Sequence, residues 1–184
     1  MSHRWISPIL GVSMLMGIQL AHAMDYLAQA VSAIDANVVF MRHENAPGFG
    51  DPENFALHDC STQRNLDEKG RKQAQKMGEQ LSASSVKFVE ILTSEWCRCK
   101  ETTDLLNVGS WQTFSGLNSF FQGYADENAT LKQLRQKLSS IKPGVTLMVT
   151  HQVVISAVTG RGAQTGEMIA FNTRTNASVR VERR

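Results

Sequence analysis

The sequence predicts an α/β protein, a three-layer α/β/α sandwich in which helices cover both faces of a mostly parallel sheet. Apolar runs typical of strands occur at 38–41, 86–92 and 145–150. Segments with helical periodicity separate these runs. Strands that alternate with helices favour a parallel sheet between two helical layers.

The composition is that of one globular domain. The chain has 184 residues, of which 42% are hydrophobic and 20% charged, and a chain of this size buries a substantial core. Its 19 Lys and Arg residues nearly balance 17 Asp and Glu residues, for a formal net charge of +2. This balance indicates no nucleic-acid-binding tail. The three cysteines are too few for a disulfide-dense scaffold and lack zinc-finger spacing.

Residues 1–23 have the layout of a secretory signal peptide. A short basic start precedes the apolar stretch Ile6–Leu20, and Ala21-His22-Ala23 forms an A-x-A cleavage site. The alternative is an uncleaved anchor, but a membrane-spanning helix needs about 20 apolar residues and this stretch is shorter. We therefore expect a periplasmic or secreted domain over 24–184, without stable membrane insertion, in an oxidising compartment.

Five segments of the expected mature chain are predicted to be helical. The first places Leu27, Ala30, Val31 and Ile34 on one stripe, which indicates an amphipathic helix. The second begins at Asp67, a typical N-terminal cap. The predicted helices span 24–35, 67–81, 97–106, 127–138 and 152–158.

The remaining segments are predicted to be strands or loops. Two short runs at 166–171 and 178–181 are expected to close the sheet as a pair of strands. The polar stretch 45–65, rich in Gly and Pro, is predicted to be a long loop, and such loops in compact domains are often functional. The segment 111–124 is expected to be irregular.

Charged side chains follow the predicted strands or begin the helices after them. Arg42 and His43 end the first strand, Arg98 lies in the helix after the second, and His151 ends the third. Because ligands of open α/β sheets bind at the carboxyl ends of the strands, we expect these four side chains to share one pocket.

Such a pocket suits a phosphate ester. Guanidinium groups match phosphate oxygens in bidentate fashion, and helix N-termini add backbone donors. A neutral imidazole can attack phosphorus directly and form a phosphohistidine, while the other cationic groups stabilise the charge of the equatorial oxygens. A proton donor for the leaving oxygen is also needed.

Four segments together resemble the histidine phosphatase superfamily, which has the phosphoglycerate-mutase-like fold. The resemblance covers most of the expected mature chain. Residues 38–43 are similar to the strand that leads into the Arg-His-Gly signature, and residues 66–74 to the Gly-Arg-x-x-Ala helix start. Residues 93–102 are similar to Ser-x-x-x-Arg-x-x-x-Thr, and residues 149–151 to the strand before the second histidine.

The resemblance implies a role for each matching residue. It makes His43 the phosphorylated nucleophile, His151 the second catalytic histidine, and Arg42 and Arg98 the phosphate-binding arginines. It implies no metal and no cofactor. The expected protein is an exported phosphatase that hydrolyses a small-molecule phosphate monoester, with no nucleic-acid partner; its substrate and oligomeric state stay open.

Two positions depart from the family pattern. The glycine after the catalytic histidine is Glu44 here, and Asn118 lies in the stretch where many members place an acidic residue. Because an amide cannot donate a carboxyl proton, mutase or phosphotransferase activity is disfavoured. Candidates for the acid are Glu44, Asp51 and Asp59, although a good leaving group would need little help. The alternative is a non-catalytic phospho-ligand-binding protein that kept the pocket but lacks the acid.

Two further features lie around the long loop. Arg64 is a candidate for binding a second anionic group of the substrate, although most lone arginines are solvated. In an oxidising compartment Cys60 is expected to pair with Cys97 or Cys99, which would attach the loop to the helix of Arg98; the alternative is three free thiols. Cys97 and Cys99 are too close in sequence to pair with each other.

Overall fold

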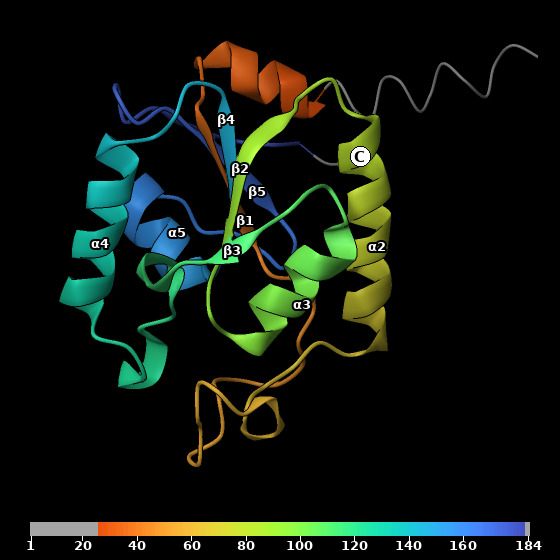
Figure 1. Ribbon diagram of the computed structural model, residues 1–184, viewed down its shortest axis with the longest axis vertical. Helices are drawn as coiled ribbons and strands as arrows, with labels where there is room; N and C mark the ends of the chain where they lie inside the picture. The colour runs from red at the N-terminus through yellow and green to blue at the C-terminus, as the bar shows by residue number, and fades with distance from the viewer. Residues whose placement is uncertain (1–25, 183–184) are drawn as a thin grey trace, which may run out of the picture.

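The computed structural model describes residues 26–182, which form one six-stranded sheet with helices on both sides (Figure 1). The strand order is β3-β2-β4-β1-β5-β6, with β1 to β4 parallel and β5 and β6 antiparallel. The predicted mostly parallel α/β sheet is confirmed. The expected signal peptide lies outside the described residues. The strands are Val38–Arg42 (β1), Phe88–Thr93 (β2), Gln112–Thr113 (β3), Val145–Thr150 (β4), Met168–Phe171 (β5) and Ser178–Arg180 (β6).

The helices form the two outer layers, as the sequence predicts. α2 and α3 lie on one side of the sheet, and α4 and α5 on the other (Figure 1). Residues 26–33 are also helical, and Leu27 packs with the core on the α2 side. In the part of the chain from 26 to 182, no helix is long and apolar enough to cross a membrane. The labelled helices are Glu68–Ala83 (α2), Cys97–Leu106 (α3), Glu127–Ser139 (α4) and Gln152–Thr159 (α5).

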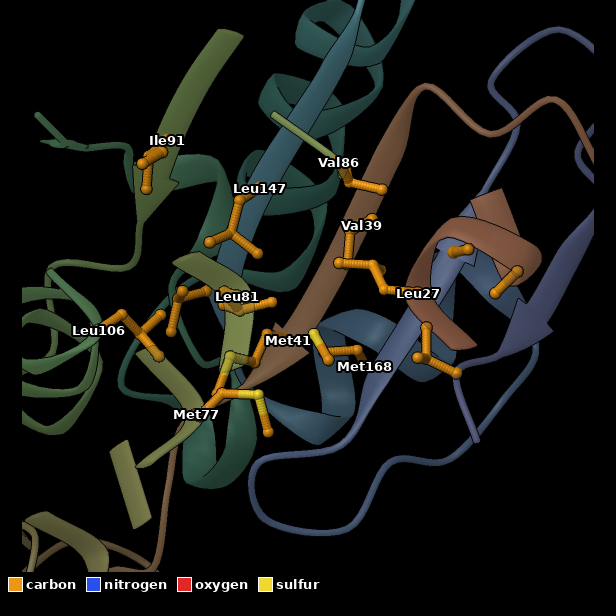
Figure 2. Close-up of a cluster of buried hydrophobic side chains, with 14 of the residues drawn as sticks. Leu27, Val39, Met41, Met77, Leu81, Val86, Ile91, Leu106, Leu147 and Met168 are labelled. Carbon is orange, nitrogen blue, oxygen red and sulfur yellow. The ribbon is translucent and has the colours of Figure 1, made fainter. Parts of the chain in front are cut away.

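The central strand β1 is buried on both faces because its side chains alternate between two cores. Val39 and Met41 pack toward α2, where Figure 2 shows them near Met77 and Leu81. Phe40 belongs to the core on the α4 side. This double burial explains why the strand reads as a continuous apolar run rather than an alternating one.

The edge of the sheet differs from the prediction. The segment 111–124 was expected to be irregular, yet Gln112–Thr113 forms the parallel edge strand β3 beside β2. Both residues are polar and exposed, so no apolar pattern marks the strand. β2 itself begins at Phe88 rather than at residue 86, and its pairing with β4 shifts register between Phe88 and Glu90.

The loop between β1 and α2 extends beyond the sheet at the carboxyl ends of the parallel strands (orange to yellow in Figure 1). A disulfide between Cys60 and Cys97, with Cα atoms 5.7 Å apart, joins this loop to the first residue of α3. Cys99 is a free, buried thiol. Of the alternatives left open by the sequence, the structure has the Cys60–Cys97 pairing, next to Arg98.

Candidate functional site

The two histidines and two arginines predicted to share one site meet in a pocket of about 510 Å³. Arg42 ends β1 and His43 follows it, Arg98 is the second residue of α3, and His151 lies between β4 and α5. The four side chains line the pocket together with Arg64. Parallel strands bring their carboxyl ends to one edge, which is why residues so distant in sequence converge.

His43 presents an unprotonated nitrogen to the pocket. Its Nδ1 lies 2.8 Å from the carbonyl oxygen of Glu44, which only accepts, so Nδ1 carries the proton and donates it. The lone pair is then on Nε2, which accepts from Arg98 Nε at 3.2 Å. Burial, followed by the charge of Arg98, holds the pKa of His43 well below its ordinary value, although the Glu44 carbonyl acts in the opposite direction. His43 is therefore neutral near pH 7, the state that a nucleophile needs.

Ser94 holds the His151 ring through a hydrogen bond at Nε2. Ser94 Oγ donates to Asn118 Oδ1 at 3.1 Å and lies 2.9 Å from His151 Nε2, so it accepts the Nε2 proton. The other ring nitrogen, Nδ1, lies 3.4 Å from Arg98 Nη2. Burial, then the charges of Arg98 and His43, keep the pKa of His151 well below its ordinary value. The rings of the two histidines are 5.4 Å apart, edge to face.

Arg98 is oriented by a buried carboxylate. Asp51 accepts two hydrogen bonds from its guanidinium, at 2.7 Å from Nη1 and 3.1 Å from Nη2, and both side chains are at most 5% exposed. Trp96 Nε1 donates to the same carboxylate at 3.0 Å. Burial by itself raises the pKa of Asp51, but the hydrogen bonds and charge of Arg98 bring it below its usual value. Bidentate pairing fixes the plane of the Arg98 guanidinium.

Arg42 and Arg64 add further positive charge to the lining of the pocket. Arg42 Nη1 donates to Gln152 Oε1 and to the carbonyl of Ala163, each at 3.0 Å. Arg64 donates from Nε to the Gly50 carbonyl at 2.8 Å and from Nη1 to the Ala46 carbonyl. Burial and the nearby charge of Arg98 lower the pKa of both arginines. Guanidinium groups gathered in this way favour an anionic ligand.

None of the three candidate acids is among the described residues that line the pocket. Asp51 is the ionised partner of Arg98 and is poorly suited to donate a proton. Asp59 is exposed, and its side chain caps the short 3-10 helix Cys60–Thr62. Glu44 is 1% exposed, and its carboxylate fills the space that a Cβ on Gly166 would occupy. These positions do not favour the expectation that one of the three serves as the acid.

Several residues of the site had no role assigned from the sequence. Ser94 fixes His151, Gln152 orients Arg42, and Thr102 joins the loop to α3 by accepting from Glu44 N and donating to the Arg98 carbonyl. Asn118 holds Ser94 and also accepts from the backbone N–H of Glu95. Gln152 lies next to His151, and Ser94 follows the last residue of β2 at the carboxyl edge of the sheet, so both positions could have identified them.

No metal centre is indicated by these side chains. Within the described range 26–182, no three His, Cys, Asp or Glu residues gather so as to hold an ion. The buried Cys99 thiol lies 3.4 Å from His151 Nε2, and burial raises its pKa to about 12. Cys99 is therefore a protonated neighbour of His151.

We expect stability to fall on mild acidification because both buried histidines resist protonation. Their folded pKa values lie below the value near 6.5 of the unfolded chain, so below that pH the unfolded state binds more protons. Between pH 7.5 and 5.5 the two sites together should cost about 3 kcal/mol of unfolding free energy. Urea unfolding at both pH values measures this loss. Asp51, whose pKa is lowered, contributes only at more acidic pH.

The His151→Gln variant is the control for that measurement. It should lose about half of the pH dependence, since one of the two buried imidazoles is gone. An unchanged slope in the variant would contradict the assignment of the effect to these histidines.

A family model matches the middle part of the chain. The model described as "Histidine phosphatase superfamily (branch 1)" matches residues 56–123, from the loop through α2, β2 and α3 to η3, the 3-10 helix Phe121–Gly123. The chain resembles the histidine phosphatase superfamily in both sequence and fold. Among curated proteins, none matches the chain.

Solved structures with the same fold are distant in sequence. The protein histidine phosphatase SixA, complexed with tungstate, superposes with a TM-score of 0.52 at 16% identity, over 78% of this chain and 92% of its own. A mycobacterial glucosyl-3-phosphoglycerate phosphatase gives 0.54 at 12% identity, over 79% and 96%. The protein TTHB049 from Thermus thermophilus gives 0.56 at 15% identity, over 78% and 98%. At such identities the likeness establishes the histidine phosphatase fold.

Proposed function

We propose that this protein is a phosphatase that hydrolyses a small phosphate monoester through a phosphohistidine at His43. The observation that carries the proposal is the unprotonated Nε2 of His43 in a pocket lined by Arg42, Arg64 and Arg98. The family match supports it, as do fold relatives that act on phosphorylated molecules: a protein histidine phosphatase and a glucosyl-3-phosphoglycerate phosphatase.

The proposed reaction has two displacements at phosphorus. His43 Nε2 attacks, the N–P bond forms, and the ester P–O bond breaks with its electron pair on the leaving oxygen. Water then attacks phosphorus, the N–P bond breaks, and inorganic phosphate leaves. The arginines stabilise the charge of the transferring group, and His151 gains affinity for a proton once a dianion lies beside it.

The arrangement of the carboxylates bears on the choice of substrate. Since the described residues that line the pocket include no Asp or Glu, the leaving oxygen receives no proton from a carboxyl group there. Esters with a stable leaving anion are therefore the favoured substrates. Asn118 is engaged with Ser94 and Glu95, which does not support mutase chemistry at that position.

Trapping of the intermediate tests this proposal. The protein is mixed with acetyl phosphate, denatured in alkali, where a phosphoramidate survives, and weighed intact. We expect the mass of one added phosphoryl group, mapped to the peptide of His43 and missing in His43→Ala. Binding of inorganic phosphate without a trapped intermediate or turnover would instead favour a phospho-ligand-binding protein, the alternative that the pocket without a carboxylate supports.

We further propose that the protein is exported. The leader-like layout of residues 1–23 and the Cys60–Cys97 disulfide both support an oxidising compartment. In a bacterial host that expresses the full chain, fractionation should recover it in the periplasm or medium with Met24 at its N-terminus. Recovery from the cytoplasm with residues 1–23 intact would contradict this proposal.

A further inference from the structure

Two exposed phenylalanines stand beside the phosphate pocket. Phe49, in the loop after β1, is 88% exposed, and Phe121, in η3, is 39% exposed. Both line the same pocket as His43 and the arginines. Their rings meet edge to face with centroids 5.2 Å apart. The pocket thus has a cationic part and an aromatic part.

The loop that carries Phe49 is held in place from two sides. Arg64 binds the carbonyls of Ala46 and Gly50, which bracket it. From the other side Gln122 Oε1 accepts from Asp51 N at 2.8 Å. Phe49 therefore projects from an anchored turn, and its exposure is a property of the fold.

The backbone of this turn also fits that arrangement. Gly50 has a φ of +70°, and a Cβ there would lie 2.2 Å from Gln122 Oε1. The positive φ therefore favours a glycine where the turn meets η3. The turn thus meets η3 at two places, Gly50 beside the Gln122 side chain and Phe49 beside Phe121.

We propose that Phe49 and Phe121 form a binding site for the leaving group and select phosphate esters whose leaving group is a flat, unsaturated ring. This inference deepens the proposed function and rests on it. The site is continuous with the pocket of His43, so an ester bound there by its phosphate places its other end on the aromatic pair. Offset or edge-to-face contact with a ring is the favourable geometry for such a pair.

The chemistry of the pocket points to the same class of substrate. With no carboxyl group among the described lining residues, a leaving group must depart as a stable anion. A phenolate meets this need and is also flat. As the bond from His43 Nε2 to phosphorus forms, the aryl P–O bond breaks, and the phenolate keeps the electron pair and later takes a proton from water.

The test compares an aryl ester with an acyl phosphate, a phosphoryl donor whose leaving group has no ring. Steady-state constants are measured for 4-nitrophenyl phosphate and acetyl phosphate, both of which have good leaving groups. In Phe49→Ala and Phe121→Ala, the ratio of kcat/KM for the aryl ester to that for acetyl phosphate should fall about three- to tenfold, the size of an aromatic contact. The loss should appear mainly in KM, because the contact is made equally in ground and transition states.

The matched variants separate this role from a structural one. Phe49→Trp keeps an aromatic ring at this position and should therefore give the same ratio of kcat/KM values as the wild type. Val89→Ala shortens another exposed apolar side chain, which does not line the pocket, and should leave both substrates unaffected. An unchanged ratio in both alanine variants would overturn the proposal, as would equal losses on both substrates.

A second measurement keeps this proposal apart from the phosphatase proposal. If the wild type turned over neither substrate, the phosphatase proposal would fail, and calorimetry would test the aromatic site alone. Phe49→Ala should then weaken binding of phenylphosphonate about three- to tenfold more than binding of inorganic phosphate. Equal weakening of the two ligands would refute the aromatic site.

Discussion

Replacing His43 by alanine is expected to lower kcat/KM for 4-nitrophenyl phosphate at least about a thousandfold. The variant lacks the nitrogen that is proposed to attack phosphorus, and loss of a nucleophile removes the covalent route as a whole. Arg42, Arg98 and His151 remain, so inorganic phosphate should still bind in calorimetry. Steady-state assays of the purified variant beside the wild type check this expectation.

Two controls accompany that measurement. A thermal melt shows whether the variant keeps the fold, and Val89→Ala, altered on the exposed surface, should keep full activity. Activity within tenfold of the wild type in a folded His43→Ala protein would contradict a phosphohistidine at this position.

Opening the Cys60–Cys97 disulfide is expected to cost about 4 kcal/mol of unfolding free energy. The two cysteines are 37 residues apart, and closing a loop of this length removes entropy of that size from the unfolded chain. Activity should fall as well, since the bridge fastens the loop that carries Asp51 and Arg64 to the helix of Arg98. Urea unfolding and the phosphatase assay, each with and without reductant, give both values.

The Cys60→Ser/Cys97→Ser double variant provides the matched comparison. It should reproduce the reduced wild type and show no response to reductant. Equal unfolding free energies of the oxidised wild type and the double variant would contradict a stabilising role for the bridge. The buried Cys99 remains in both proteins and does not distinguish them.

The sequence predicted the parts of the site that the sheet positions. Two strands with clear apolar runs end at or beside Arg42, His43 and His151. A third such strand, β2, is followed by α3, whose second residue is Arg98. Parallel strands of one sheet end at one edge, so convergence followed from element order. Both helical layers were also predicted, because the amphipathic helices have a strong periodic pattern of apolar residues.

The parts contributed by the long loop were not predictable in the same way. Asp51 was a candidate acid by residue type, but its pairing with Arg98 depends on how the loop folds back, which no periodic pattern records. The same is true of Phe49, whose neighbour Phe121 lies in a distant turn. β3 was missed because two exposed polar residues form a strand only through their partner β2.

Glu44 stands where the histidine phosphatase pattern has a glycine, and its side chain limits the space for a residue in the connection between α5 and β5. In the histidine phosphatase pattern a glycine follows the histidine; here the Glu44 carboxylate reaches the segment before β5, where a Cβ on Gly166 would lie 2.3 Å from its oxygens. Gly166 N also donates to the carbonyls of Arg42 and His43. The small residue thus stands at position 166 instead of position 44. The Glu44 side chain fills the space beside Gly166, so the two positions share a single volume.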